Sequence, residues 1–244
     1  MKTLVFDLFA PLGHFKVPYT VTSPLTFPVP PKTSLYGIFG AILGVDKDKY
    51  IEKFNKIGCK VAIRLLNPVQ RIHISENLIN TKNVELFARM NSRKSPPHTR
   101  IKFEFLKNPA FRIYITMNNL DILNNMAELL KKHKSIYSVS LGLSECLANY
   151  TYIGMFDSVC KENDKEFVKI SSILPADSVS GTNDISIGEP GNKYIRVHLP
   201  VKMKPDRELV EIKDFIVETN GHYIEARVKK YNDVIDLKEN VILF

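Results

Sequence analysis

A proline-studded segment near the N-terminus constrains this chain more than any other feature. Between Pro11 and Pro31 the segment also contains Pro18, Pro24, Pro28 and Pro30. Each proline holds φ near −65°, removes a backbone donor and disfavours a helical conformation for the residue before it. The segment can therefore be neither a helix nor a central strand, and we expect a stiff, extended loop.

Regular elements are predicted on both sides of this loop. Residues 3–9 are β-branched and aromatic, and every second side chain is apolar, which predicts an opening strand. After the loop, apolar residues recur at helical spacing at Leu35, Ile38, Phe39 and Ile42. Thr33 or Ser34 is expected to cap this helix, and Gly44 to close it.

The middle of the chain alternates between core elements and a polar excursion. A second strand is expected over Lys60–Leu66, followed by a basic, weakly periodic excursion over Gln70–Thr99. Arg100–Leu106 and Phe111–Met117 each alternate between polar and apolar residues, and Lys107-Asn108-Pro109 separates them. This pattern predicts a β-hairpin with one apolar and one basic face.

A second helix and another strand complete the first part of the chain. Asn119 is expected to cap a helix over Leu120–Lys132, and Ala148–Met155 reads as a strand. The predicted order is strand, helix, strand, hairpin, helix, strand, which is the split βαβ pattern of an α+β, ferredoxin-like (RRM-like) palm. We expect this domain to span residues 1–155, with a basic β-hairpin thumb inserted at about 68–110.

The last third has a different character. Acid-rich Asp157–Glu166 and the loop Ser178–Asn192 are expected to act as linkers around short strands. Asn220-Gly221 lies between two strand-like runs and predicts a type I′ hairpin. Residues 156–244 are therefore expected to form a small, antiparallel, β-rich domain.

Positive charge is concentrated in the middle of the chain. The formal net charge is +8, and counting by region assigns +9 to residues 45–150 and −3 to residues 151–244. The excursion mixes cations with His73, Phe87 and His98, a combination that neutralises phosphates and offers planar groups for base stacking. We expect it to contact nucleic acid; a solvated basic loop, or one that meets an acidic protein, is the alternative.

Other function classes find less support. Cys59, Cys146 and Cys160 show no metal-ligand spacing, which favours a reduced, cytoplasmic setting without a metal cofactor. No apolar run is long enough for a membrane span, and no phosphate-loop or dinucleotide-binding glycine motif is present, so we expect neither membrane association nor a small-molecule cofactor.

Two positions are candidates for direct chemistry. His14 follows Gly13 in the stiff loop, and with Lys16 or a tyrosine it could act as a general acid or base in RNA cleavage; alternatively it only hydrogen-bonds the loop or a phosphate. Gly142 lies between the second helix and a strand, where backbone N–H groups could approach a phosphate. It is as readily explained as a simple connector.

Two motifs resemble one known family. The run Phe6-Asp-Leu-Phe-Ala-Pro-Leu-Gly-His-Phe-Lys16 and the proline turn and glycine-containing helix of residues 22–44 resemble the N-terminal signature of the CRISPR-associated protein 5 family, in the RAMP superfamily. Leu141-Gly-Leu-Ser-Glu-Cys146 resembles its second signature. The general appearance is nearest the I-B-type branch.

The resemblance implies an antiviral-defence role in a type I interference complex (Cascade). Such subunits grip the 5′ handle of CRISPR RNA and contact the backbone and large subunits of the complex. The implied RNA-binding residues lie in the first loop, in the basic thumb and in the second signature: His14, Lys16, Arg71, Arg89, Arg93, Lys94, Arg100, Lys102, Gly142 and Ser144.

A comparison within the family bears on catalysis. The I-C-type branch cuts precursor CRISPR RNA and carries a tyrosine where this chain has Leu43, together with a Lys-His pair in the later insertion. The only Lys-His dipeptide here is Lys132-His133, at the end of the second helix. Leucine can neither give nor take a proton, so we expect an RNA-binding subunit that is not an enzyme. A metal-independent endoribonuclease and a protein-only scaffold are the alternatives.

Overall fold

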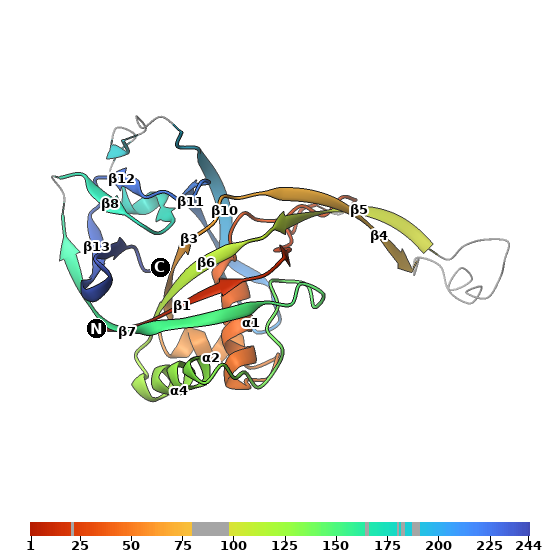
Figure 1. Ribbon diagram of the computed structural model, residues 1–244, viewed down its shortest axis with the longest axis horizontal. Helices are drawn as coiled ribbons and strands as arrows, with labels where there is room; N and C mark the ends of the chain where they lie inside the picture. The colour runs from red at the N-terminus through yellow and green to blue at the C-terminus, as the bar shows by residue number, and fades with distance from the viewer. Residues whose placement is uncertain (21, 80–97, 164–165, 180, 182–183, 187–190) are drawn as a thin grey trace.

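The computed structural model describes residues 1–20, 22–79, 98–163, 166–179, 181, 184–186 and 191–244. Its centre is a six-stranded sheet with the strand order β14-β13-β7-β1-β6-β3 (Figure 1). Four strands form its larger part: β1 (Lys2–Phe9), β3 (Lys60–Leu65), β6 (Ala110–Thr116) and β7 (Asn149–Glu162). Each neighbouring pair among these four is antiparallel.

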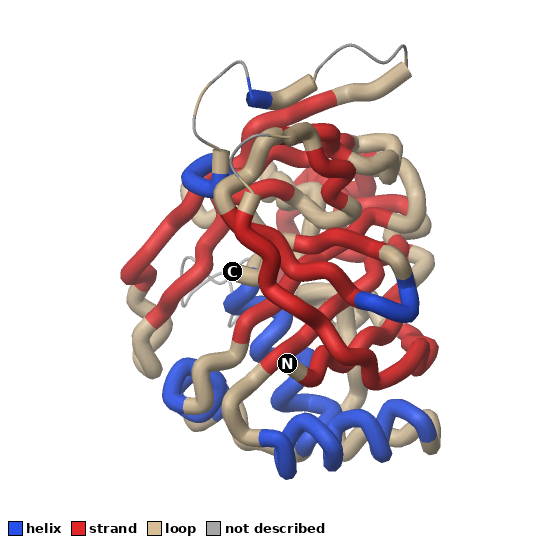
Figure 2. The backbone as a smooth tube through the Cα atoms, turned by 90° about the vertical axis from the view of Figure 1, so that its left-hand side faces the viewer, coloured by secondary structure: helices blue, strands red, loops and turns tan. Residues whose placement is uncertain are grey.

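Three helices cover one face of this sheet. They are α1 (Lys32–Leu43), α2 (Tyr50–Lys56) and α4 (Leu120–Lys131). In Figure 1 and Figure 2 the long helices lie together on one side of the strands. Apolar side chains of α1 and α4 share one buried cluster with Leu4, Phe6 and Leu8 of β1, because alternate residues of a strand face the same side of a sheet.

The last two strands of the sheet join it through the end of β7 and fold over part of the face opposite the helices. Val5, Ala62 and Tyr114 of the sheet pack with residues of β13 (Lys230–Val234) and β14 (Glu239–Val241). The Glu239 carboxylate accepts hydrogen bonds from Arg64, Arg112 and Tyr114. Burial and this carboxylate raise the pKa of Tyr114 well above its usual range, so the hydroxyl remains a donor. These contacts tie the end of the chain to the central sheet.

A long β-hairpin projects from the body of the molecule. It consists of β4 (Arg71–Ile79) and β5 (His98–Lys107), paired antiparallel, and the short strand β2 (Leu12–Gly13) pairs with the base of β5. Figure 1 shows the hairpin extending far beyond the rest of the chain. The excursion predicted over residues 70–99 therefore leaves the core as a strand and returns as one.

The remaining strands form two small sheets. One pairs β8 (Val168–Ile170) with β12 (Ile224–Ala226), and the other has the order β10-β11-β9. The latter strands are β9 (Leu174–Pro175), β10 (Tyr194–Met203) and β11 (Leu209–Glu218). The 3-10 helix η1 (Ala176–Ser178) directly follows β9, and η3 (Ile235–Leu237) joins β13 to β14 of the central sheet.

Two predicted hairpins do not form. β5 pairs with β4, whereas β6 pairs with β1 and β3, so Lys107–Pro109 is the bend at which the chain passes from the projecting hairpin into the central sheet. Asn108 takes a positive φ there, and its N–H donates to the carbonyl of Pro11 instead of a hairpin partner.

The hairpin predicted around Asn220-Gly221 is also wrong. β11 pairs with β10 and β9, and β12 pairs with β8. The Glu218 carboxylate accepts hydrogen bonds from the backbone N–H groups of Asn220 and His222. Those donors are thus used by a side chain, and the chain leaves the turn toward a different sheet.

Three further features differ from the predictions: the start of α1, the presence of α2 and the length of β7. The helix α1 begins at Lys32 after Pro31 and has no side-chain N-cap, so neither Thr33 nor Ser34 caps it, whereas Gly44 closes it with a positive φ as expected. The helix α2 was not predicted. The linker predicted over Asp157–Glu166 is wrong for most of its length, because β7 continues to Glu162 and pairs with β13; β7 thus crosses the expected domain boundary at residue 155.

Within the described ranges, no helix is both long and apolar enough to span a membrane.

Candidate nucleic-acid interface

The projecting hairpin has two chemically different faces. The register pairs Ser75 with Lys102 and Asn77 with Arg100, which places these polar side chains on one face. The adjacent pairs Ile72–Phe105 and Ile74–Phe103 lie on the other face and are partly or fully buried. The basic and apolar faces predicted for residues 100–106 are therefore confirmed. What the sequence pattern did not predict is that β4 supplies the second strand.

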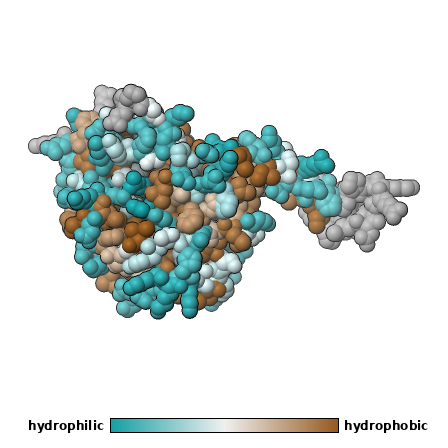
Figure 3. All heavy atoms as spheres, in the orientation of Figure 1, coloured by the Kyte–Doolittle hydropathy of each residue, from teal (hydrophilic) through white to brown (hydrophobic). Residues whose placement is uncertain are grey.

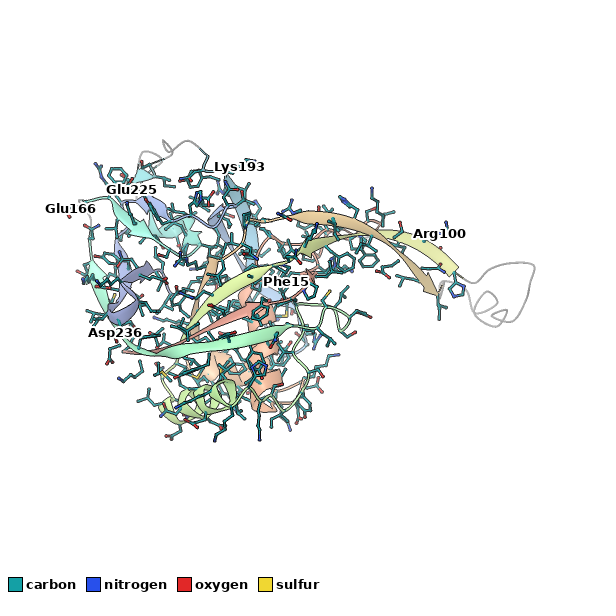
Figure 4. The ribbon with its side chains drawn as sticks, viewed as in Figure 1. Phe15, Arg100, Glu166, Lys193, Glu225 and Asp236 are labelled. Atoms are coloured by element: carbon teal, nitrogen blue, oxygen red, sulfur yellow. The ribbon has the colours of Figure 1, made fainter. Side chains whose placement is uncertain are left out.

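Arg100 and Lys102 are exposed cations without an acidic partner in the described part of the chain. Figure 4 shows Arg100 on the outer part of the hairpin. An unpaired cation keeps its charge available, because no neighbouring carboxylate neutralises it. Two such residues on one extended face can neutralise phosphates of a nucleic-acid backbone.

The base of the same face contains one buried acid. The Glu104 side chain is buried, its Oε1 accepts a hydrogen bond from the Thr26 N–H at 3.1 Å, and its carboxylate lies 3.7 Å from Arg71 Nε and 3.9 Å from His73 Nε2. Glu104 therefore partly neutralises the positive charge of Arg71, whereas Arg100 and Lys102 have no such partner among the described residues. Sequence reasoning missed this role of Glu104, although a single acid alternating within a basic strand was a usable signal.

His14 lies beneath the surface. Only 1% of it is exposed, and its ring contacts Phe103 and Phe105 at centroid distances of 5.5 Å. Nδ1 lies 2.7 Å from the carbonyl oxygen of Glu104, which can only accept, so Nδ1 carries the proton. The buried Nε2 has no hydrogen-bond partner among the described residues. The side chain thus holds the first loop against β5.

Gly142 contacts the same loop. The His14 N–H donates to the carbonyl of Leu141 at 2.9 Å. Gly142 has φ +92°, and a Cβ there would overlap the carbonyl oxygen of His14 and lie 2.7 Å from its carbon. The structure thus brings the two signature segments into direct backbone contact. The glycine is required because no side chain fits between the two loops.

A cavity of about 440 Å³ lies beside Gly142. One face of α1, Tyr50 of α2, residues 138–142, the end of β10 and the β10–β11 loop line it. Its polar side chains are the hydroxyls of Thr33, Ser34, Tyr50, Ser138 and Ser140 together with Arg207. Hydroxyls and an arginine are groups that hydrogen-bond phosphate oxygens. The C-terminal third of the chain therefore contributes a cation next to the second signature segment.

The other predicted site residues are placed as follows. Lys16 is exposed and its backbone bridges to Thr26, and Ser144 is exposed on the second signature segment. Arg89, Arg93 and Lys94 lie outside the described residues. The structure thus brings together the first loop, the second signature and the base of the hairpin. Arg100 and Lys102 lie farther out along β5, and Figure 4 labels Arg100 there.

The buried cysteines are unsuited to nucleophilic chemistry. Burial raises the pKa of Cys59 to about 12 and that of Cys146 to about 11, so both remain neutral thiols near pH 8. Cys160 on β7 is exposed. We expect iodoacetamide at pH 8 to alkylate Cys160 in the native protein and to modify Cys59 and Cys146 only after denaturation. Mass spectrometry of the digested protein measures this; rapid native labelling of Cys59 would contradict the burial described here.

Comparisons with known proteins agree with this architecture. The family model described as CRISPR-associated protein (Cas_Cas5) matches residues 3–175. A search of curated protein sequences found no match. Among solved structures, a CRISPR protein from Archaeoglobus fulgidus is similar, with 15% identity, a TM-score of 0.59 and coverage of 99% of this chain and 98% of that one.

Two further solved structures are similar at the level of the fold. A chain of a CRISPR RNA-guided surveillance complex has 15% identity, a TM-score of 0.53 and coverage of 93% of this chain and 92% of that one. A structure described as a Cas protein has 13% identity, a TM-score of 0.51 and coverage of 93% and 95%, respectively.

Proposed function

The chain belongs to the CRISPR-associated Cas5 protein family, and from this premise we propose that it is a non-catalytic, RNA-binding subunit of a type I interference complex (Cascade). In this role it binds the 5′ handle of CRISPR RNA and helps to assemble the complex for antiviral defence. The observation that carries the proposal is a pair of exposed cations, Arg100 and Lys102, on one face of a projecting hairpin, with no acidic partner among the described residues.

The arrangement of the elements supports the architecture expected for such a subunit. The order β1-α1-β3-β6-α4-β7, with strands arranged β7-β1-β6-β3, supports a ferredoxin-like palm. The β4–β5 hairpin corresponds to the proposed thumb, and the cavity beside Gly142 offers a second place for a phosphate. The similarity to a chain of an RNA-guided surveillance complex supports placement in such an assembly.

The placement of His14 favours binding over cleavage. A general acid or base must come within hydrogen-bond reach of the reacting atoms, whereas His14 is buried between two phenylalanines and donates to a backbone carbonyl. Leu43 has no proton to exchange. The less basic C-terminal third, with its net charge of −3, is proposed to face the backbone and large subunits.

Incubation with CRISPR repeat RNA in EDTA tests this proposal. We expect salt-dependent retention of the RNA on a filter and no cleavage products on a denaturing gel, because the exposed cations bind phosphates and His14 is buried away from any bound RNA. Site-specific cleavage, lost in His14→Gln, would establish the endoribonuclease instead. Absence of retention at about 50 mM salt, with complex assembly unaffected by RNase, would establish the protein-only scaffold.

A further inference from the structure

An uncharged hollow lies at the end of the central sheet from which the hairpin projects. Its volume is about 620 Å³, and its lining combines aromatic, aliphatic, proline and asparagine side chains: Phe9, Ala10, Pro11, Asn67, Asn108, Pro109, Leu147, Ala148 and Asn149. We call it the Phe9 pocket. None of these residues carries a charge, although the protein as a whole is strongly basic.

Phe9 faces the side of the sheet opposite the helices. Leu4, Phe6 and Leu8 point into the helix-covered core, and Phe9, one residue after Leu8, points the other way. The C-terminal strands cover only part of that open face. Phe9 remains 38% exposed, and no aromatic ring packs against it within the described ranges. Asn149 lies directly opposite it on β7.

Three asparagine side chains line the pocket together with this exposed ring. Asn67 donates to the carbonyl of Asn108 at 3.0 Å, and Asn149 accepts from the Tyr150 N–H at 2.8 Å. The remaining amide groups, which are the Asn67 oxygen, the Asn149 nitrogen and the whole Asn108 side chain, have no hydrogen-bond partner in the part of the chain that the structure describes. The pocket therefore presents both donors and acceptors beside a flat apolar surface.

The composition of the lining selects among ligands. A phosphate would find no cation there, and a purely apolar side chain of a protein would bury the amides without partners, at a cost in free energy. A nucleobase satisfies both requirements, because its face stacks on an aromatic ring and its edge carries donors and acceptors. In Figure 3 apolar residues gather where the hairpin meets the body, whereas hydrophilic residues prevail farther along it.

We propose that the Phe9 pocket holds one unstacked nucleobase of single-stranded RNA. The Phe9 ring is the stacking surface, and Asn108 and Asn149 hydrogen-bond the base edge. This assignment rests on the proposed RNA-binding function and deepens it: the cations of the hairpin hold phosphates and supply affinity for any sequence, whereas this pocket distinguishes one base from another. Lys107, exposed and adjacent to Asn108, connects the two surfaces.

A double-mutant cycle between protein and RNA tests the pocket. Filter binding compares the parent, Phe9→Ala, Phe9→Tyr and the control Leu120→Ala, which truncates a 51%-exposed apolar side chain on α4. The probes are CRISPR handle RNA and a set of RNAs in which each base in turn is replaced by an abasic site. We expect Phe9→Ala to weaken binding by roughly 5- to 100-fold, with the salt dependence unchanged, and Phe9→Tyr and Leu120→Ala to bind as the parent does.

The cycle identifies the base as well. One abasic position should weaken binding to the parent by the same factor and have no further effect with Phe9→Ala. Asn149→Ala provides a second variant should thermal unfolding show that Phe9→Ala is misfolded; it is expected to weaken the discrimination between bases at that same position.

Three other outcomes would overturn the proposed pocket, and the first two leave the proposed RNA-binding function intact. If Phe9→Ala and Asn149→Ala bind RNA as the parent does while Arg100→Glu/Lys102→Glu does not, the protein binds RNA elsewhere. If RNA binding is unchanged but the Phe9→Ala protein no longer assembles with the other subunits, the occupant is a protein. If the parent itself retains no RNA, the proposed function and the pocket fail together.

Discussion

Reversing two charges, in Arg100→Glu/Lys102→Glu, is expected to weaken binding of single-stranded CRISPR repeat RNA on the order of 10- to 100-fold near 100 mM salt. Both side chains are exposed on the same face of the β4–β5 hairpin and have no acidic partner among the described residues. Each phosphate contact that is lost also removes counterion release, so the slope of log K against log salt should fall by about 1.4 for two contacts.

A matched control separates a local effect from one of net charge. Lys131→Glu/Lys134→Glu changes the total charge by the same amount, at two exposed lysines, one at the end of α4 and one just after it. We expect this variant to bind RNA within about twofold of the parent, since charges beyond roughly 10 Å are largely screened at 0.1 M salt. Equal losses in the two variants would mean that only overall charge matters, and the hairpin would have no particular role in RNA binding.

Replacing Gly142 by alanine is expected to lower the free energy of unfolding by about 3 kcal/mol or more, and the melting temperature by roughly 6–12 °C. Two effects add. The backbone has φ +92°, which a residue with a Cβ adopts only at a cost, and the new methyl group would overlap the carbonyl of His14. Thermal unfolding followed by circular dichroism measures the change.

Gly191→Ala is the matched control. Gly191 has nearly the same φ, +96°, but nothing in the described part of the chain lies within 4 Å of a Cβ built there. It should therefore show the backbone cost alone, about 1–2 kcal/mol. Equal losses of unfolding free energy in the two variants would contradict this prediction. They would mean that the close approach of Gly142 to the first loop adds no cost beyond that of the backbone conformation.

The elements of the central sheet were largely predictable, because their signals are local. The alternation of Leu4, Phe6 and Leu8, the helical spacing from Leu35 to Ile42 and the Asn119 cap each depend on residues close in the chain, and β1, α1 and α4 form where these patterns lie. The Asn119 side chain accepts from the Ile122 N–H, as a capping residue should. The short helix α2 was missed because its seven residues contain little periodic pattern.

Strand pairing was less predictable. The segment Lys107–Pro109 has the composition of a hairpin turn, and local preference alone would pair β5 with β6. The strands β1 and β3, which are distant in the sequence, occupy both edges of β6 instead, and β5 pairs with β4. At Asn220-Gly221 the Glu218 carboxylate has a comparable effect, because it binds the N–H groups that a hairpin would have used.

The candidate site shows the same division. The alternation of Arg100 and Lys102 with apolar residues is a property of the sequence, and so is the concentration of positive charge in residues 45–150. The burial of His14, its contact with Gly142 and the neutralisation of Arg71 by Glu104 join residues as far as 128 positions apart. No local pattern encodes such contacts, because they arise only when the first loop, β5 and the second signature segment meet.

Local sequence alone accounts for β1, α1 and α4 and for the positive charge of residues 45–150, because backbone preference and side-chain type are properties of neighbouring residues. Packing of the whole chain pairs the strands, leaves Arg100 and Lys102 without an acidic partner among the described residues, and buries His14 beneath the first loop. It also left Phe9 exposed beside three asparagines. These properties depend on which distant side chains come within hydrogen-bond or van der Waals range, and that is a consequence of packing the whole chain.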